Sequence, residues 1–425
     1  MKKPQNNNNL PKGWRKVKLG EIAQNFDSKR IPLSSMQRAK MHGEYPYYGA
    51  AEIVDYINDY IFDGLYLLIA EDGTVITNGN KPMLQLVSGK FWVNNHAHII
   101  RGKNDLETKY LFYALKNTPI IPYVTGAVQL KLTQENLNKI EIPYSEDEKL
   151  RHRIVNILSA FDDKIELNNK IIETLEQMAQ EIFKEWFIEF NFPVSSVNSE
   201  KLRVNSEKLK SLGYKDAGGK FVDSELGKIP EGWKVGYLGD EIYSEIIKPG
   251  IKKFEREKIY LATADVVKNE VVNEKTKISY NNRPIRANME PILNSVWFAK
   301  MINTYKVLFF FEGNKDDIER YILSTGFMGI KALRNMQYYL YLFVNSEKFH
   351  QIKDTLVQGA VQEAITNTNV KQIKFFIPPT DLINKFNEKI DLIFIRSYQL
   401  KKENQKLAAL SDLLLPKLMS GEMEV

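Results

Sequence analysis

The chain has 425 residues and a net charge of +6, with 43% hydrophobic and 26% charged residues. These values are typical of a globular protein of two or three domains, and they exclude a collagen, a disordered tail protein and a disulfide scaffold. Cysteine is absent, which excludes disulfides and thiolate chemistry and leads us to expect a reducing, cytoplasmic compartment. We expect no signal peptide and no membrane association, since apolar runs such as Tyr338 to Val344 are too short to span a bilayer.

Residues 1–144 are predicted to form a β-rich module, called module 1 below. The short runs YLLIA, QLVSGKFWV and HAHIIRG are typical of strands, whereas LETKYLFYALKN is typical of a helix. Met1 to Ala50 holds ten Lys and Arg against three Asp and Glu, which gives this module a basic surplus. A basic surplus alone indicates an acidic partner only weakly.

Residues 145–190 are predicted to form a long helix that carries a heptad seam. The spacing between seam positions alternates between four and three residues for more than four heptads, which indicates a coiled coil. The alternative, in which the helix packs on its own β module, predicts a wider apolar stripe. The seam residues are Ile154, Leu158, Phe161, Ile165, Asn168, Ile172, Leu175, Ala179, Ile182 and Trp186.

The rest of the chain repeats this plan after a connector over residues 191–229, which is rich in Ser, Asn, Lys and Gly. Residues 230–380 form module 2, with the strand-like runs VWFAKM, KVLFFF and YYLYLFV, and residues 381–425 form a second helix. Its seam has the same spacing at a constant offset of 232 residues. The seam residues are Phe386, Ile390, Ile393, Ser397, Leu400, Asn404, Leu407, Ser411, Leu414 and Leu418.

Two pairs of matching segments indicate that the chain is an internal repeat. PKGWRKVKLG at residues 11–20 matches PEGWKVGYLG at residues 230–239, and GAVQLKLTQENLNKI (Gly126 to Ile140) matches GAVQEAITNTNVKQI (Gly359 to Ile373). We therefore predict an α+β fold with two β-rich modules, two antiparallel coiled-coil helices and a pseudo-two-fold repeat. In that register Asn168, fifth in its seam, faces Asn404, sixth in the other, whereas a parallel pair would place Asn168 against Leu400.

The motifs of common enzymes are absent. The sequence has no GxxxxGK(S/T) loop, no GxGxxG fingerprint, no GxSxG elbow and no HExxH helix. Asp147 to Lys149 resembles a nuclease D/E-x-K run but opens a charged helix. His96 and His98 share one face of a predicted strand without a third ligand at a recognisable spacing, so we predict no metal site. These absences favour a binding protein.

Basic, amide and aromatic residues of both modules are the candidates for contacting DNA. Arg and Asn can read guanine and adenine edges with two hydrogen bonds, and Lys and Tyr can hold phosphates. The candidates in module 1 are Lys29, Arg30, Arg38, Lys40, His42, Tyr47, Asn78, Asn80, Lys81, Asn94 and Asn95. Those in module 2 are Lys252, Lys253, Arg256, Lys258, Arg283, Arg286 and Asn288.

Over nearly its whole length the chain resembles the specificity subunit of a Type I restriction-modification enzyme. The resemblance rests on the two repeated segments, the helical tails, YPYYGA and GKFWVNNHAHII in module 1, and RPIRANM and NSVWFAKM in module 2. It implies two target recognition domains that each read one half of a bipartite DNA site. It also implies that the helices set the spacer and dock modification subunits, probably two, with restriction subunits joining the complex.

The resemblance further implies that this chain is catalytically silent and holds no cofactor. S-adenosylmethionine, ATP and Mg are expected on the partner subunits. We also expect the off-seam residues Phe183, Phe187 and Ile188 to accept helices from modification subunits, with packing on the adjacent module as the alternative.

Two alternative functions, a stand-alone DNA methyltransferase and a protein-only adaptor, make different predictions. A stand-alone DNA methyltransferase needs an (N/D)PP(F/Y/W) motif, and the nearest string, IPPT at Ile377, lacks both the Asn or Asp and the aromatic residue. A coiled-coil adaptor that binds only protein would show no salt-sensitive affinity for DNA.

Overall fold

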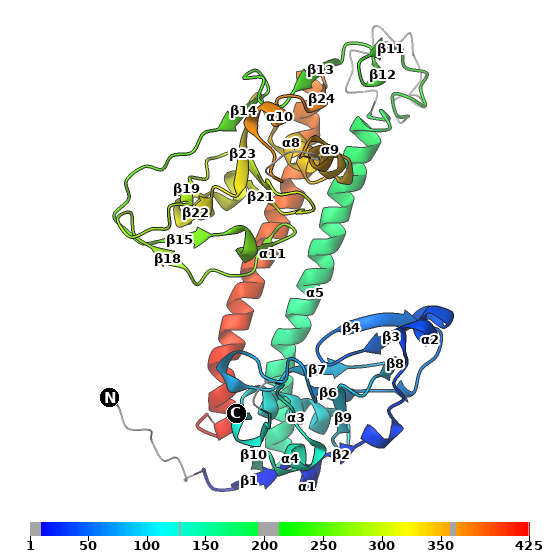
Figure 1. The fold of residues 1–425 in the computed structure, drawn as a ribbon, viewed down its shortest axis with the longest axis vertical. Coiled ribbons are helices and arrows are strands. Elements are labelled where there is room, and N and C mark those ends of the chain that lie inside the picture. Colours follow the sequence, from blue (N-terminus) through cyan, green and yellow to red (C-terminus); the bar gives the residue numbers. More distant parts are fainter. Residues whose placement is uncertain (1–9, 127–128, 194–211, 358–362, 424) are drawn as a thin grey trace. The chain divides into compact units, whose positions relative to one another are not determined.

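The structure is a computed structural model that describes residues 10–126, 129–193, 212–357, 363–423 and 425, without the side chain of Asn78. The chain divides into two compact units (Figure 1). Unit 1 comprises residues 1–168 and 403–425, and unit 2 comprises residues 169–402. Helices and strands are mixed in each unit, as the predicted α+β class requires. No helix in the described part of the chain is long and apolar enough to cross a membrane.

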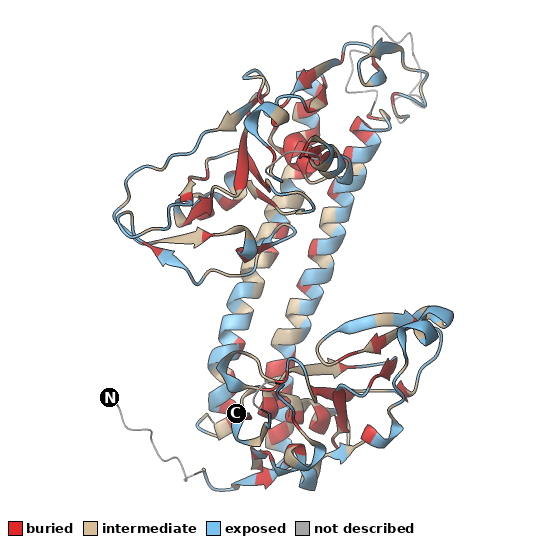
Figure 2. Cartoon of the chain, in the orientation of Figure 1, coloured by how far each residue is buried: buried red, intermediate tan, exposed pale blue. Residues whose placement is uncertain are grey.

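Two four-stranded sheets form the framework of module 1. In the first sheet all neighbours are antiparallel, in the order β2 (Gln24–Asn25), β9 (Ala97–Arg101), β6 (Tyr66–Ala70) and β7 (Leu84–Val87). The second sheet has the order β4 (Ile53–Ile57), β3 (His42–Tyr48), β8 (Lys90–Val93) and β5 (Phe62–Asp63). Its central pair, β3 with β8, is parallel. All five residues of β6 are buried, which explains why this apolar strand lies inside its sheet (Figure 2).

Four short α-helices occur in the described part of module 1. The longest, α3, is the predicted helix, and the Asn104 side chain caps it by accepting a hydrogen bond of 2.9 Å from the Glu107 N–H. Its apolar face, including Tyr110 and Leu111, is buried in the same core as Ile100 of β9. The helices are α1 (Leu19–Ile22), α2 (Ser35–Lys40), α3 (Asp105–Lys116) and α4 (Gln134–Lys139).

Module 2 repeats the strand order of module 1 and the direction of every pairing. Its first sheet is antiparallel, with β14 (Ser244–Ile247), β23 (Phe327–Ala332), β20 (Ser295–Ala299) and β21 (Val307–Phe310). Its second sheet has β18 (Lys277–Ile278), β15 (Lys258–Leu261), β22 (Tyr321–Ser324) and β19 (Ala287–Met289). The central pair, β15 with β22, is again parallel. The internal repeat found in the sequence is therefore a repeat of topology.

One short antiparallel ladder joins the first and last strands of each module. The repeated opening segment forms β1 (Trp14–Lys18), which pairs with β10 (Glu141–Ser145). In module 2, β13 (Lys234–Tyr237) pairs with β24 (Lys374–Ile377) in the same way. Each closing strand leads directly into a long helix.

Unit 2 has further elements outside these sheets. A two-stranded hairpin joins β16 to β17, and another joins β11 to β12. The elements are β16 (Val266–Val267), β17 (Glu270–Val271), β11 (Phe221–Ser224), β12 (Gly227–Pro230), α7 (Lys315–Arg320), α8 (Gln337–Val344), α9 (Glu347–Val357) and α10 (Asn367–Val370).

The long helices are α5 (Glu148–Phe187), with 40 residues, and α11 (Thr380–Ser420), with 41 residues. In unit 1 the start of α5 shares a core with the end of α11, through Ile154 and Leu415. In unit 2 the end of α5 meets the start of α11, where the rings of Trp186 and Phe386 lie 5.7 Å apart. The two helices are thus antiparallel within each unit, and all their seam residues are buried or half-buried.

The predicted register of the two seam asparagines is confirmed within unit 1. The Asn168 Nδ2 group donates a hydrogen bond of 2.8 Å to Oδ1 of Asn404 and another of 3.0 Å to Oε2 of Glu403. Asn168 is fully buried. Facing Asn168 with the apolar Leu400, as in a parallel pair, would have left this amide without these partners.

The prediction that YYLYLFV forms a strand is wrong. The run forms helix α8, and its residues Tyr338 to Val344 are all buried. A helix that is apolar on every side has no amphipathic period, so its sequence cannot be distinguished from that of a buried strand.

The prediction that Phe183 and Phe187 form a docking surface is also wrong. Both side chains are buried in the core of unit 2, and the Phe187 ring lies 4.9 Å from the ring of Tyr339 on α8. The alternative of packing on the adjacent module is correct for these two residues. Ile188 is 43% exposed.

Part of the segment predicted as a connector packs into the core of unit 2. The Phe192 ring stacks on Tyr214 at 4.7 Å and on Trp233 at 5.5 Å. Residues 194–211 of this segment lie outside the described residues.

Candidate nucleic-acid interface

Five of the predicted DNA-binding residues of module 1 are exposed. Lys81 is half-buried, and the Asn78 side chain is outside the description. The turn before Lys81 is made by Gly79 and Asn80, whose φ angles of 77° and 64° suit residues that tolerate the left-handed region. The exposed residues are Lys29, Lys40, His42, Asn80 and Asn95.

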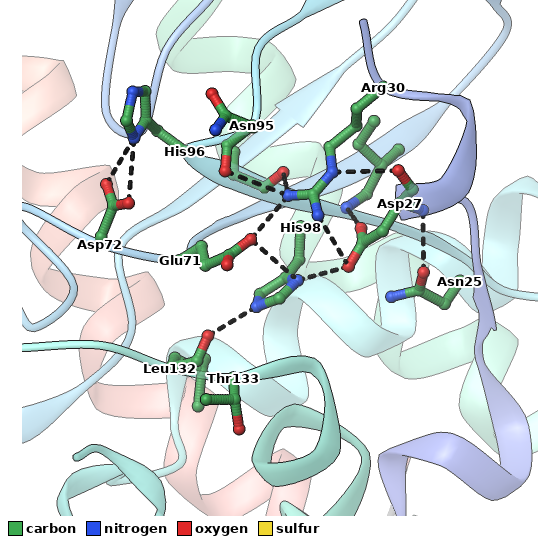
Figure 3. Close-up of polar contacts among 12 residues, drawn as sticks. Asn25, Asp27, Arg30, Glu71, Asp72, Asn95, His96, His98, Leu132 and Thr133 are labelled. Carbon is green, nitrogen blue, oxygen red and sulfur yellow. Dashed lines mark hydrogen bonds and ion pairs between the residues drawn. The ribbon is translucent and has the colours of Figure 1, made fainter. Parts of the chain in front are cut away.

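Arg30, in contrast, belongs to an ionic network inside module 1 (Figure 3). Its guanidinium lies 2.7 Å from Oε2 of Glu71 and 3.6 Å from Oδ2 of Asp27, and it donates a hydrogen bond of 2.9 Å to the Ala97 carbonyl. Only 16% of the Arg30 side chain is exposed. The side chain of Arg30 thus joins β9 to the segments that follow β2 and β6 in the same sheet.

His98 is the buried centre of the same network. Its Nδ1 atom lies 2.5 Å from Oδ2 of Asp27, and its Nε2 atom lies 2.7 Å from the carbonyl oxygen of Leu132 (Figure 3). Leu132 belongs to the repeated GAVQ segment, and its N–H donates to the Glu71 carbonyl at 2.8 Å. The network therefore anchors the repeated segment to the sheet.

The carboxylates of this network remain charged because of their partners. Burial alone would raise the pKa of Asp27, but the hydrogen bond and charge of His98, the Ile99 N–H and the charge of Arg30 lower it below its ordinary value. Burial would likewise raise the pKa of Glu71, and hydrogen bonding to Arg30 with the charges of His98 and Arg30 lowers it.

Three further candidates of module 1 have structural roles. Arg38 lies 3.0 Å from the Asp55 carboxylate, donates to the Leu33 carbonyl at 2.8 Å and covers the Tyr47 ring. Tyr47 is buried, and its hydroxyl accepts a hydrogen bond from the Leu33 N–H. Asn94 is 9% exposed, and its side-chain oxygen accepts a hydrogen bond from the His96 N–H. The sequence showed the chemistry of these side chains but not which partners would occupy them.

The two histidines that share a strand face, His96 and His98, have separate partners. His96 Nδ1 binds the Asp72 carboxylate at 2.8 Å, whereas His98 binds Asp27 (Figure 3). Asp147 of the D/E-x-K run accepts a hydrogen bond from the Lys149 N–H, as a residue at a helix start does.

One group of three potential metal ligands occurs in the described part of the chain. It consists of Glu107, Glu148 and His152. Arg151 donates to Oε1 of Glu107 through Nη2 at 2.7 Å and through Nε at 3.0 Å. This guanidinium already neutralises Glu107, so the group is poorly suited to a cation.

In module 2 the exposed residues among the predicted DNA-binding candidates lie on two loops. Lys252, Lys253 and Arg256 lie between β14 and β15, and Arg286 lies on the loop between β18 and β19. Arg283 is half-buried, with its guanidinium 4.2 Å from the centre of the Tyr280 ring. The first of these loops is joined to strand β19, because the Gly250 N–H donates to the carbonyl of Asn288, itself half-buried. Lys258 of β15 is 3.4 Å from Glu290 and contributes to this framework.

One cation of module 1 that the sequence did not single out, Lys90, lies among tyrosine rings. Lys90 lies 4.5 Å from the centre of the Tyr60 ring, and Tyr45 packs against the same tyrosine at 5.2 Å. Hydrogen bonding to Tyr60 raises the pKa of Lys90 above its ordinary value. Tyr45 contacts residues 15 and 45 positions away in the chain, so no short-range sequence pattern indicates this group.

The fold and these surfaces define a duplicated protein in which each β-rich module presents exposed cations and leads into a long helix. Residues 11–177 match the family model of the Type I restriction modification DNA specificity domain. The chain is therefore similar to Type I restriction-modification specificity subunits, most directly over the segment that the family model matches.

Individual relatives cover different shares of the chain. It is 38% identical over 142 residues to the putative type I restriction enzyme specificity subunit S.HindORF215P of Haemophilus influenzae, covering 33% of this chain and 36% of that relative. It is 24% identical to the MjaIX specificity subunit of Methanocaldococcus jannaschii, covering 98% and 95%. The crystal structure of a Type I S subunit from M. genitalium has the same fold, with a TM-score of 0.59, 16% identity and 98% of each chain covered.

Proposed function

We propose that this chain is the DNA specificity subunit of a Type I restriction-modification complex. Each module would read one half of a bipartite DNA site. The observation that carries the proposal is the duplicated topology, in which the same pair of four-stranded sheets presents exposed cations in module 1 and again in module 2. Cations of this kind neutralise phosphates and give DNA affinity, whereas amide and arginine groups among them can read bases.

The two half-sites would differ, because equivalent positions in the two modules carry different chemistry. The Leu132 N–H donates to the Glu71 carbonyl, and the equivalent Ile365 N–H donates to the Lys300 carbonyl. A carboxylate in module 1 thus corresponds to a lysine in module 2. From the strand pairing, His98 corresponds to Met328. Repeated topology with divergent side chains supports two independent readers of an asymmetric site.

The helices would hold the readers at a fixed spacing and dock two modification subunits. A seam of 33 residues spans roughly 50 Å, or about 14 bp of DNA, which leaves a gap of about 5 to 8 bp between half-sites of a few base pairs. This chain would be non-catalytic and hold no cofactor. S-adenosylmethionine, ATP and Mg would belong to the modification and restriction subunits of a cytoplasmic complex.

The test is to sequence the methylated bases of a genome that carries this gene and its modification partner, alongside a strain from which the gene is deleted. We expect one bipartite motif with a constant gap, which is lost in the deletion strain. A continuous motif, or a motif that survives the deletion, would contradict the proposal. A gel shift of the assembled complex over a salt series separates this function from a protein-only adaptor, which would not bind DNA.

A further inference from the structure

Ile285 is the most exposed large apolar side chain in the described part of the molecule. It is 98% exposed, and the next, Met36, is 77% exposed. A single exposed apolar residue is ordinary on a protein surface, so exposure alone indicates nothing about Ile285. Its surroundings, in contrast, are unusual.

The loop that carries Ile285 is basic and free of acidic residues. It joins β18 to β19, and the segment from Lys275 to Met289 contains four cations and no Asp or Glu. Two of the cations, Arg283 and Arg286, lie on either side of the Pro284-Ile285 pair. A positively charged surface around an apolar side chain complements a polyanion that also offers apolar surface.

The loop is also fixed in place. The Ala287 N–H donates to the Pro284 carbonyl at 2.8 Å, and the Thr325 N–H donates to the Arg286 carbonyl at 2.9 Å. The proline ring restricts the backbone immediately before Ile285. Ile285 is therefore held outward by its own loop, and little conformational entropy would be lost when a ligand covers it.

We propose that Ile285 is a base-contacting residue of module 2, with Arg283 and Arg286 holding the phosphates beside it. This inference rests on the proposed DNA-reading function and assigns part of the reading to an apolar contact. Apolar side chains flanked by arginines contact base steps in the grooves of DNA, and an isoleucine side chain can also cover a thymine methyl group. Such a contact adds affinity at its own base pair without neutralising a phosphate.

The test compares I285A with wild type in the full chain assembled with its modification subunits. Binding is measured to duplexes that carry the methylated motif and to duplexes with single base-pair changes in each half-site. We expect I285A to bind the motif about 10- to 60-fold more weakly, because each of three lost carbon atoms is worth roughly a fourfold change. The loss should fall on one or two adjacent base pairs of one half-site.

The salt dependence distinguishes the apolar contact from a phosphate contact. I285A should leave the slope of log affinity against log salt unchanged, whereas R286A should lower its magnitude by roughly one and weaken binding to all sequences. V267A is the matched control, since Val267 is a β-branched residue of module 2 that is 51% exposed, on the β16–β17 hairpin. V267A should bind DNA as wild type does, and thermal unfolding should show that all three variants are folded.

Failure of this inference is separate from failure of the proposed function. If wild type prefers the motif and I285A binds each duplex with the same affinity as wild type does, Ile285 is not a base contact. If I285A instead prevents assembly with modification subunits, the residue belongs to a protein interface and the inference is wrong. A wild-type complex without any sequence preference would contradict the proposed function itself.

Discussion

At the scale of single residues, the polar network of module 1 shows how a buried charge is held. Asp27, 8% exposed, accepts hydrogen bonds from the Ile99 N–H and from His98, and Arg30 lies beside it. Removing one member leaves the others buried with incomplete pairing, which costs more than the net value of the intact network. Arg30 therefore differs from the exposed Lys29 and Lys40, although all three were equally plausible DNA contacts from the sequence.

We predict that D27N lowers the free energy of unfolding by about 2–4 kcal/mol at pH 7, because it removes the carboxylate that pairs with His98 and Arg30. D72N is the matched control. It makes the same chemical change at a carboxylate whose partner, His96, is 51% exposed, and it should cost less than about 1 kcal/mol. Urea unfolding measures both. Equal costs for the two variants would contradict a structural role for the buried network.

The pH dependence of the D27N effect follows from the lowered pKa of Asp27 in the folded protein. Its contribution is fully present above the unfolded pKa of about 3.9 and is lost as the pH falls through the folded value. The difference between wild type and D27N should therefore shrink as the pH falls below about 4. Urea titrations at a series of pH values would measure this stability difference. A difference that grows on acidification would contradict a lowered pKa of Asp27 in the folded protein.

At the scale of secondary-structure elements, the helices were predicted better than the β-rich modules. The heptad spacing fixed which side of α5 and α11 is buried and which residue faces Asn168, because both follow from a regular period. Helix α8 has no such period because it is buried on all sides, so the sequence could not show whether this segment is a helix or a strand. The partners of Arg30 and Arg38 lie at other positions of the fold, so the sequence could name the candidate site residues but not separate structural from exposed ones.

The asparagine pair provides a test of register. The double variant with Asn168→Leu and Asn404→Leu should raise the unfolding temperature by several degrees, since a buried polar pair fixes register at a cost in stability. The same variant should discriminate less between duplexes whose gap differs by one base pair. The single variant N404L is the control, because it removes one hydrogen-bond acceptor of the buried Asn168 amide and should be destabilised by about 1–3 kcal/mol. A double variant less stable than N404L would disprove this account.

The end of α5 provides a second test. F187E places a charge in the core of unit 2 and should cost at least about 4 kcal/mol, whereas I188E, one residue later on the exposed side, should change stability by less than about 0.5 kcal/mol. Thermal unfolding of the two variants checks this directly. If F187E unfolded like wild type but failed to bind modification subunits, Phe187 would be a docking residue after all.

At the scale of the whole molecule, the two modules are copies of one topology whose side chains have diverged. Exchanging Met1 to Pro143 for the corresponding module of a relative should alter one half of the methylated motif and leave the other half and the gap unchanged. The reason is that each module has its own sheets and its own closing ladder. Sequencing of methylated bases measures the result. A change in both halves would show that the modules do not read DNA independently.

The closing ladders also have a consequence for how such a gene can change. Trp14 is paired with Ser145, and Lys234 is paired with Ile377, so each module enters and leaves the chain at neighbouring points. The segments at these borders are the ones that the two halves share in sequence. Recombination between the shared borders could replace everything between them in a single exchange and still leave a closed ladder. A gene of this kind could then acquire a new DNA specificity in one exchange, and the protein that it encodes would still fold.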